Sequence, residues 1–327
     1  MMEPAHGYIE TPEVRLHYVD WGGDGPPLLL LHANGFHARV WDPLVPHLRE
    51  RFRVIALDQR GHGDSGLPST DFGWSRFAED LFHVIAALGV AGCFAAGHSF
   101  GGPSVAVCAA RHPSSIRRAV LIDPVLRGGT PEGAANAPNR LAEGARKRRA
   151  VWDSPYQFEE TMRQRSAFAR WRPEFLHAYA QHGLRRRPDG HYELKCRPEV
   201  EAAVFEAGTA FDPWPDLERL AIPVLLLRAT ATGGLPSPSP LDACRRIAHC
   251  HEVPVACRRR SPRGCMRRCW RRSTSTAAIE PRFGLTGSGY RRRPAHDDVV
   301  HREHVRLYGR DADLLHDSVG ACGRRPQ

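Results

Sequence analysis

The sequence predicts an α/β fold in which a mostly parallel sheet is covered by helices on both faces. Short, uninterrupted apolar runs with the length of a buried strand occur at residues 27–31, 53–57 and 93–96. Polar, glycine-rich turns follow these runs, and segments with helical spacing of apolar residues lie between them. Such alternation of strand, turn and helix builds a parallel sheet that is buried on both faces.

The first two predicted strands each lead into a polar turn. Residues 27–31 are followed by the loop His-Ala-Asn-Gly-Phe at 32–36, and residues 53–57 by a glycine-punctuated turn at 58–65. A helix is expected over residues 74–88, because apolar residues recur there every three or four positions. These turns place polar side chains at the carboxyl edge of the predicted sheet.

The third strand leads into the most informative segment, Gly-His-Ser-Phe-Gly at residues 97–101. Ser99 stands between this strand and a helix that we expect over residues 101–111. A strained strand-to-helix turn needs neighbours without bulk, and Gly97, Gly101 and Gly102 meet that need. The N-terminal amides of the helix point to the place where an oxyanion forms during acyl transfer. The segment therefore predicts a nucleophilic serine.

Three motifs follow one another along the chain. They are the loop at 32–36, the Asp-x-Arg-Gly-x-Gly-x-Ser turn at 58–65, and the turn at 97–101 that carries the serine. Over about residues 8–256 the chain resembles the α/β-hydrolase fold family, in its serine-nucleophile branch of esterases and lysophospholipases. The joint occurrence of the motifs is far more specific than any one of them. The resemblance implies the α/β-hydrolase fold with a helical cap insertion.

The resemblance also implies roles for individual residues. Ser99 would be the nucleophile, and the backbone amides of Asn34 and Phe100 would form the oxyanion hole. His32, Asp58 and Arg60 would be structural, as polar residues that end a strand or brace a turn. We expect no cofactor and no metal site.

A serine in this turn favours hydrolysis of a carboxylic ester or thioester. Epoxide hydrolases and haloalkane dehalogenases of this fold carry an aspartate there instead. Acyl transfer, perhydrolysis and carbon-carbon bond cleavage stay open as alternatives, because enzymes of this fold share the motifs. A catalytically impaired protein, kept as a binding module or as a gene remnant, is the alternative from another class.

The serine needs a carboxylate and a histidine to activate it. The predicted strand at 223–227 has no carboxylate after it before Asp242. Asp123 directly follows another predicted strand, at 118–122, and we therefore choose it as the acid. Asp242 stays the alternative, and Asp123 could instead accept hydrogen bonds from loop amides.

The catalytic histidine is expected after the last strand, at residues 252–256, but the sequence there continues as Cys-Arg-Arg-Arg-Ser-Pro-Arg. We assign no histidine to this role. The histidines left as candidates lie near that strand or in the tail: His249, His251, His296, His301, His304 and His316.

Composition changes at the same point. Residues 1–240 hold 27 basic and 27 acidic side chains, whereas residues 241–327 hold 19 arginines against 9 acidic residues and six of the nine cysteines. We hypothesise that the reading frame slips near codon 257. The codons CGA CGC CGG TCA CCN encode Arg-Arg-Arg-Ser-Pro, and read one nucleotide later they encode Asp-Ala-Gly-His. That tetrapeptide resembles the loop which carries the histidine in many relatives, so the base would be absent from the chain as written.

We expect four segments: core at 1–125, helical cap at 126–216, core again at 217–256, and an arginine- and cysteine-rich tail, disordered or frame-shifted, at 257–327. Aromatic residues of the cap either line an acyl pocket or, as we prefer, form the cap's own core. They are Trp152, Tyr156, Phe158, Phe168, Trp171, Phe175 and Tyr179. The basic run at 146–149 is read as a solvated helix face in preference to a site for an anionic substrate.

The expected partner is a small acyl substrate. Few aromatic residues accompany the arginine clusters of the tail, which argues against a specific nucleic-acid site. No Cys-x-x-Cys pair indicates zinc, and without a secretion signal we expect no disulfide. No run of about 18 apolar residues predicts a membrane span. We expect a cytoplasmic protein and make no prediction of its oligomeric state.

Overall fold

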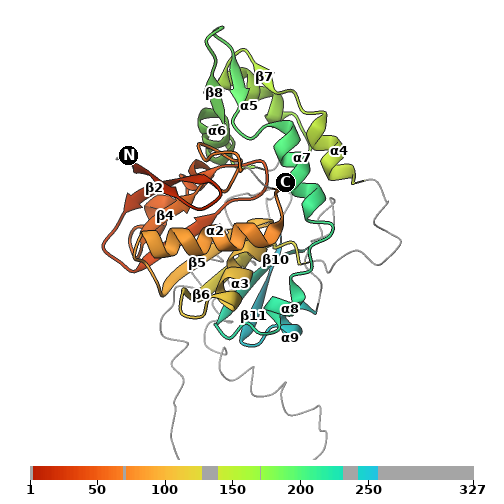
Figure 1. Ribbon diagram of the computed structural model, residues 1–327. Helices are drawn as coiled ribbons and strands as arrows, with labels where there is room; N and C mark the ends of the chain where they lie inside the picture. Colours follow the sequence, from red (N-terminus) through yellow and green to blue (C-terminus); the bar gives the residue numbers. More distant parts are fainter. Residues whose placement is uncertain (1–2, 69–70, 127–138, 170, 231–241, 257–327) are drawn as a thin grey trace, which may run out of the picture. The chain divides into compact units, whose positions relative to one another are not determined.

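The computed structural model describes residues 3–68, 71–126, 139–169, 171–230 and 242–256 (Figure 1). All of these fall within one compact unit. The predicted tail at 257–327 lies outside the described residues.

An eight-stranded sheet organises the described residues, in the order β1-β2-β4-β3-β5-β6-β10-β11. The strands are β1 (Ala5–Glu10), β2 (Arg15–Gly22), β3 (Pro27–Leu31), β4 (Arg53–Leu57), β5 (Cys93–His98), β6 (Ile116–Ile122), β10 (Val224–Thr230) and β11 (Cys250–Ala256). Strands β1 and β2 pair antiparallel, β2 pairs antiparallel with β4, and the pairs from β4 to β11 are parallel. The predicted fold class is confirmed.

The central strands are buried on both faces, as their uninterrupted apolar sequences predict. Along β3, Leu29 and Leu31 pack into one core cluster, while Leu28 and Leu30 pack into a second cluster. Successive side chains of a strand point to opposite faces, so a run of leucines serves both clusters. The antiparallel hairpin β1–β2 was not predicted.

Helices cover both faces. The first cluster lies under α2 (Trp74–Ala87) and α3 (Gly101–Arg111), which pack side by side (Figure 1). The second lies under the short helices η1 (Ala38–Trp41) and α1 (Val45–Leu48). Both predicted helices are confirmed: α3 has the predicted bounds, and α2 ends one residue earlier.

Between β6 and β10 the chain forms an insertion, and we use this name for its described residues from 139 to 207. Its helices are α4 (Arg140–Arg146), α5 (Pro155–Arg163), α6 (Pro173–His182) and α7 (Pro198–Ala207). A small antiparallel sheet accompanies them, formed by β7 (Val151–Trp152), β9 (Tyr192–Leu194) and β8 (Leu184–Arg186) in that order. The prediction of helices alone was incomplete, because strands of two or three residues are too short to show an alternating pattern.

Aromatic residues of the insertion form its own core, as we preferred. Trp152, Phe158 and Tyr179 are buried together, and Phe168 and Trp171 pack against them. Tyr156 is exposed. The basic run at 146–149 is not uniformly solvated, because the Arg148 side chain is only 16% exposed and pairs with Glu201.

Two short helices flank the last two strands. Helix α8 (Trp214–Leu217) packs on α3, and Trp214 and Leu217 belong to the first core cluster, although the predicted cap extended to residue 216. Helix α9 (Ala243–Arg246) is joined to β11 by a disulfide between Cys244 and Cys250. The expectation of no disulfide was therefore wrong. Within the described residues, no helix has the length and apolar character that crossing a membrane requires.

Candidate active site

Ser99 occupies the sharp turn between β5 and α3. Its φ of 52° lies in the left-handed region, where residues with a side chain are strained. The Ser99 N–H donates to the carbonyl of Ile122 at 2.8 Å, and the Ser99 carbonyl accepts from Gly102 at 3.1 Å and Val125 at 3.2 Å. Hydrogen bonds on both sides therefore hold the serine in its strained conformation, which is the geometry predicted for a nucleophile on a strand-to-helix turn.

Close packing explains the glycines around Ser99. A Cβ atom at Gly97 would overlap the backbone carbonyl of Gly101, and one at Gly102 would lie 2.5 Å from Pro124 Cβ. A Cβ atom at Gly101 would lie 2.8 Å from the carbonyl oxygens of Leu31 and His32. The start of α3 thus touches the end of β3, which brings the loop after β3 next to the serine.

The two predicted oxyanion donors lie on these touching segments. Phe100 is buried, and its ring contacts Trp74, Phe77 and His62 with centroid distances of 5.0, 4.5 and 6.4 Å. Among the described residues, the backbone N–H groups of Asn34 and Phe100 have no hydrogen-bond acceptor. Two such donors on adjoining loops could bind a developing oxyanion.

The side chain of Asn34 is fixed at both ends. Its Oδ1 lies 3.0 Å from His62 Nε2, and its Nδ2 donates to the carbonyl of Glu201 at 2.9 Å. His62 comes from the turn after β4, whereas Glu201 lies on α7 of the insertion. The sequence analysis did not identify His62 or Glu201 as neighbours of the site, and no local pattern marks a contact between residues so far apart.

Asp123 lies at the carboxyl end of β6, the strand that neighbours β5. Its φ is 43°, its N–H donates to the carbonyl of Leu227 at 2.7 Å, and its Oδ1 accepts from the N–H of Ala229 at 3.1 Å. Burial lowers the pKa of His98, and the nearby Asp123 carboxylate raises it in part. Asp123 therefore combines a hydrogen bond from a backbone amide of β10 with a position on the strand end next to Ser99.

The alternative acid lies elsewhere. Asp242 is exposed at the start of α9, and that helix is tied to the amino end of β11 through Cys244 and Cys250, whose Cα atoms are 5.0 Å apart. Ser99 stands at the carboxyl ends of the parallel strands, which is the opposite edge of the sheet. The geometry favours Asp123.

Two of the candidate histidines also lie at the edge of the sheet opposite Ser99. The carbonyl of His249 accepts from Val224 N–H at the amino end of β10, and His251 pairs with Leu225. A seven-residue strand is about 20 Å long, so both lie far from the carboxyl edge. Strand β11 ends at Ala256, level with the end of β10. The predicted place of the histidine follows directly, but it and the candidates of the tail lie outside the described residues.

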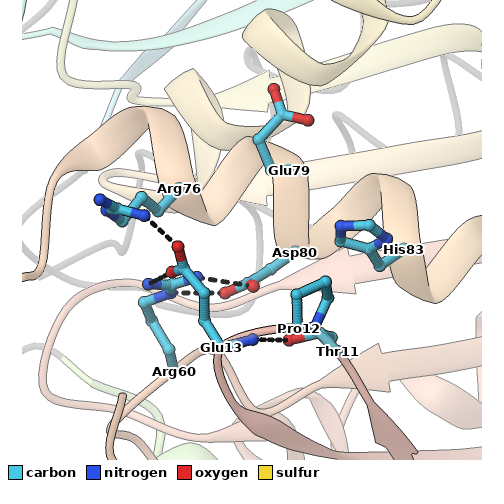
Figure 2. Close-up of a pocket in the computed structure, with 8 residues that line it drawn as sticks. All are labelled: Thr11, Pro12, Glu13, Arg60, Arg76, Glu79, Asp80 and His83. Atoms are coloured by element: carbon cyan, nitrogen blue, oxygen red, sulfur yellow. Dashed lines mark hydrogen bonds and ion pairs between the residues drawn. The ribbon is translucent and has the colours of Figure 1, made fainter. Parts of the chain in front are cut away.

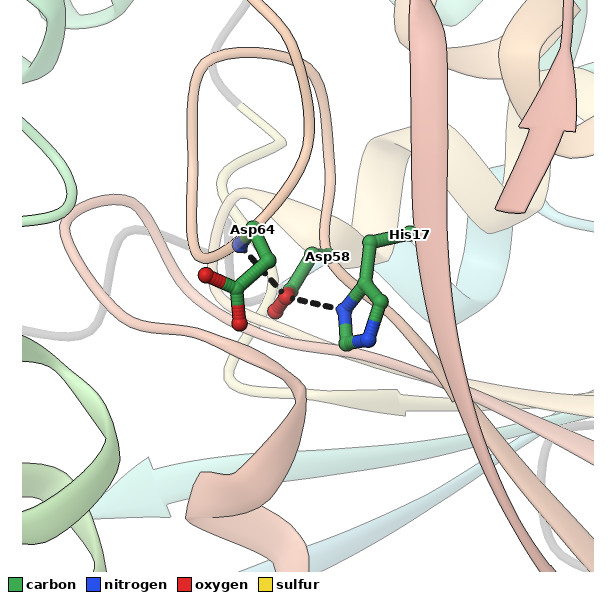
Figure 3. A group of neighbouring side chains, drawn as sticks. All are labelled: His17, Asp58 and Asp64. Atoms are coloured by element: carbon green, nitrogen blue, oxygen red, sulfur yellow. Dashed lines mark hydrogen bonds and ion pairs between the residues drawn. The ribbon is translucent and has the colours of Figure 1, made fainter. Parts of the chain in front are cut away.

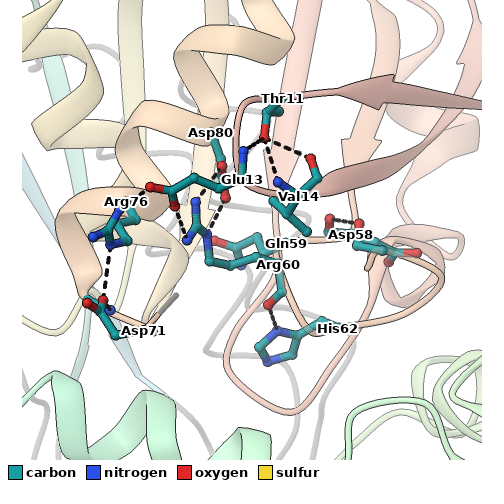
Figure 4. Close-up of polar contacts among 12 residues, drawn as sticks. Thr11, Glu13, Val14, Asp58, Gln59, Arg60, His62, Asp71, Arg76 and Asp80 are labelled. Carbon is teal, nitrogen blue, oxygen red and sulfur yellow. Dashed lines mark hydrogen bonds and ion pairs between the residues drawn. The ribbon is translucent and has the colours of Figure 1, made fainter. Parts of the chain in front are cut away.

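His32, Asp58 and Arg60 each bond to neighbouring segments, and Figure 4 shows the surroundings of Asp58 and Arg60. The His32 Nε2 accepts from the N–H of Gln59 at 3.1 Å. Arg60 is 1% exposed and pairs with Asp80 of α2 at 2.7 Å and with Glu13 at 2.9 Å. These contacts join the turn after β4 to neighbouring elements, which agrees with structural roles.

Asp58 is part of a cluster with His17 and Asp64, whose donor atoms lie within 4.8 Å of one another (Figure 3). His17 Nδ1 bonds to Asp58 Oδ2 at 2.7 Å, and the N–H groups of Ala38 and Asp64 also donate to the Asp58 carboxylate. Burial alone would raise the pKa of Asp58, but the hydrogen bond and charge of His17 hold it well below its usual value. Asp64 is further engaged by Lys195 at 2.7 Å. Because these atoms already bond to other groups of the protein, we assign the cluster a structural role rather than a role as a metal site.

A cavity of about 230 Å³ lies beside α2 (Figure 2), and Ser99, Asn34 and Asp123 are not among the residues that line it. It is lined by Thr11, Pro12, Glu13, Arg60, Arg76, Glu79, Asp80 and His83. Its arginines are paired with Glu13, Asp71 and Asp80, so its charged groups stabilise the fold around them.

Comparison with known proteins supports this architecture. Residues 26–187 match the family model described as alpha/beta hydrolase fold. A bifunctional esterase/perhydrolase of Acinetobacter calcoaceticus is 38% identical over 123 residues, which cover 36% of this chain and 45% of that protein. The 2-(acetamidomethylene)succinate hydrolase of Mesorhizobium japonicum is 37% identical over 101 residues, which cover 31% of this chain and 36% of that protein. The chain thus spans less than half the length of these curated relatives.

The fold extends further than the sequence matches. The crystal structure of E-2-(acetamidomethylene)succinate hydrolase superposes with a TM-score of 0.67, covering 78% of this chain and 91% of that chain at 22% sequence identity. Such a likeness shows the fold alone. Together with the family match, the sheet order and the turn that carries Ser99, it shows that the chain belongs to the α/β-hydrolase fold family.

Proposed function

We propose that the protein is a serine hydrolase that cleaves a carboxylic ester or a related small acyl substrate through an acyl-enzyme intermediate on Ser99. The observation that carries this proposal is the φ of 52° at Ser99, held between a strand and a helix. A strained serine between a strand and a helix, at the carboxyl edge of the sheet, presents its hydroxyl to a substrate.

In the proposed reaction, Ser99 Oγ attacks the acyl carbon while a histidine takes its proton. The backbone amides of Asn34 and Phe100 stabilise the resulting oxyanion. Loss of one such donor costs about 3–4 kcal/mol in an acyl-transfer enzyme. The alcohol or thiol then leaves with a proton, and water attacks the acyl-enzyme to release the acid. Asp123 orients the histidine, whose expected place follows Ala256.

The relatives support the ester class and one alternative reaction. One of them is called a bifunctional esterase/perhydrolase. In perhydrolysis, hydrogen peroxide replaces water as the attacking group on the acyl-enzyme and a peracid leaves. Both reactions need the same serine, so the products formed with and without peroxide distinguish them.

A second candidate function is an impaired hydrolase fold that lacks its base. It is favoured by the position of His249 and His251 at the wrong edge of the sheet, and by the sequence after Ala256. The proposed frame slip near codon 257 explains that sequence. Resequencing the source DNA over codons 250–275 tests it: an extra or missing base that restores Asp-Ala-Gly-His supports the slip, and the sequence as written refutes it. The cytoplasmic location stays a prediction.

The main proposal is tested with p-nitrophenyl acetate and butyrate. We expect turnover by the wild type and a loss of about a thousandfold or more in Ser99→Ala, as for removal of a nucleophile. Ser114→Ala is the matched control, since Ser114 also has a positive φ, 72°, but lies on the turn before β6 at the opposite edge of the sheet. Equal turnover by Ser99→Ala and the wild type would refute the role of Ser99.

A further inference from the structure

Four consecutive residues after β3, from Asn34 to His37, touch the insertion. The side-chain Nδ2 of Asn34 donates to the carbonyl of Glu201, and the Tyr179 hydroxyl donates to the carbonyl of Gly35 at 3.4 Å. His37 Nε2 lies 3.2 Å from the carbonyl of Tyr179. We name residues 34–37 the β3 loop.

Phe36 makes the largest apolar contact of the β3 loop. Its ring packs against Tyr179, Trp171 and Phe168 of the insertion, with centroid distances of 4.7, 5.2 and 6.4 Å. The side chain of Phe36 therefore belongs to the aromatic core of the insertion, although its backbone continues from the central sheet.

A largely buried ion pair lies over the glycine of this loop. Gly35 has a φ of +82°, and a Cβ atom there would lie 2.7 Å from Glu201 Oε1 and 3.3 Å from an Arg148 nitrogen. Arg148 bonds to the Glu201 carboxylate and to the Tyr179 hydroxyl, the latter at 2.7 Å. Burial would lower the pKa of Arg148, but the neighbouring Tyr179 and Glu201 raise it above its usual value. The pair is thus a charged, hydrogen-bonded link between α7, α6 and the segment after α4.

Contacts with the core are concentrated on either side of the β3 loop. His32 is bonded to Gln59 before it, and the N–H of Ala38 donates to Asp58 at 2.6 Å after it. Within the loop, the side chain of Asn34 also bonds to the core, through His62. The insertion therefore supplies most of what fixes residues 34–37.

From these contacts we infer that Arg148, Glu201 and Tyr179 are positioning residues. Through them the insertion holds the β3 loop so that the backbone N–H of Asn34 stays directed at the substrate oxyanion. The inference rests on the proposed function. A displacement of a catalytic donor by about 1 Å can reduce a rate by up to about a hundredfold, so loosening this link lowers kcat more than it changes KM.

The test uses two variants of the full chain, each with a matched control. Tyr179→Phe removes only the hydroxyl, and Tyr156→Phe makes the same change on an exposed tyrosine of α5. The double variant Arg148→Met/Glu201→Gln removes both charges and so leaves no unpaired buried ion. Its control is Arg146→Met/Glu206→Gln, which removes a 2.7 Å ion pair that also joins α4 to α7 but is about half exposed.

Hydrogen exchange of the peptide over residues 32–38 is the first measurement, because it needs no activity. We expect the loop amides to exchange about tenfold faster in Tyr179→Phe and in Arg148→Met/Glu201→Gln than in the wild type and the two controls. Urea unfolding in parallel identifies any variant that is globally destabilised, and the gentler Tyr179→Phe then decides the result.

Ester hydrolysis is the second measurement. We expect kcat to fall about tenfold in both variants, with KM changed less than about twofold. Exchange and kcat equal to those of the controls would overturn the inference. If the wild type does not hydrolyse esters, the proposed function fails, and hydrogen exchange still decides whether the insertion holds the loop.

Discussion

At the scale of single residues, Ser99 and Asp123 share an unusual property. Both have positive φ values, 52° and 43°, and both directly follow neighbouring parallel strands. An L residue in the left-handed region is less stable than glycine would be in the same conformation. Both residues lie at the carboxyl edge of the sheet, where we propose them as the nucleophile and the acid.

The strain at Ser99 predicts that the residue which suits the turn's conformation best, glycine, gives an inactive protein. Ser99→Gly should be about 0.5–1 kcal/mol more stable than Ser99→Ala, because glycine adopts the turn without strain but loses more chain entropy on folding. Both variants should be inactive on esters. The free energy of unfolding in urea is the measurement.

Ser114 supplies the control for this prediction. Ser114→Gly should also be more stable than Ser114→Ala, since its φ is 72°, and both should keep the activity of the wild type. A Ser99→Gly variant that is clearly less stable than Ser99→Ala would show that the turn stores no strain at this position.

At the scale of elements, the turn between β5 and α3 depends on contacts with no space for a side chain. Gly97→Ala would push a methyl group into the carbonyl of Gly101. We expect a loss of about 1–3 kcal/mol in unfolding free energy and a large loss of ester hydrolysis, because the turn must shift. Thermal unfolding and p-nitrophenyl acetate turnover measure the two effects.

Gly144 on α4 is the matched position for that prediction. A Cβ atom there meets nothing within 4 Å, so Gly144→Ala should leave activity unchanged and raise stability by up to about 1 kcal/mol. Equal effects of alanine at Gly97 and Gly144 would mean that close packing at the turn is not required.

The sequence predicted the elements with strong local patterns. Strands β3 and β4 and helix α3 have the predicted bounds, since continuous apolar runs and a glycine-rich turn mark them. The β1–β2 hairpin was missed because β1 is mostly exposed and shows little apolar pattern. The contact between Asn34 and Glu201 joins residues 167 positions apart, and only the folded chain brings them together.

At the scale of the whole molecule, three buried histidines link stability to pH. Burial lowers the pKa of His32 to about 3 and the pKa values of His37 and His62 to about 4. In the unfolded chain these groups have pKa values near 6.5, so unfolding takes up close to one proton for each of them between about pH 6.5 and 4. Stability from these three groups is therefore fully present above pH 6.5 and falls as the pH is lowered through this window.

Urea unfolding at pH 7.5, 6.0 and 5.0 measures this linkage. We expect the free energy of unfolding to decrease steadily over the series and the slope to be shallower in His37→Gln, which lacks one of the three imidazoles. A stability that is constant from pH 7.5 to 5.0 would contradict neutral burial of these histidines.

Covalent labelling is the decisive measurement of whether Ser99 is an activated nucleophile. The folded protein is incubated with a fluorophosphonate probe, and the modified residue is identified by mass spectrometry. We expect one label per chain, located on Ser99 and absent from Ser99→Ala. A folded wild-type protein that takes up no label, or a label that persists in Ser99→Ala, would contradict it.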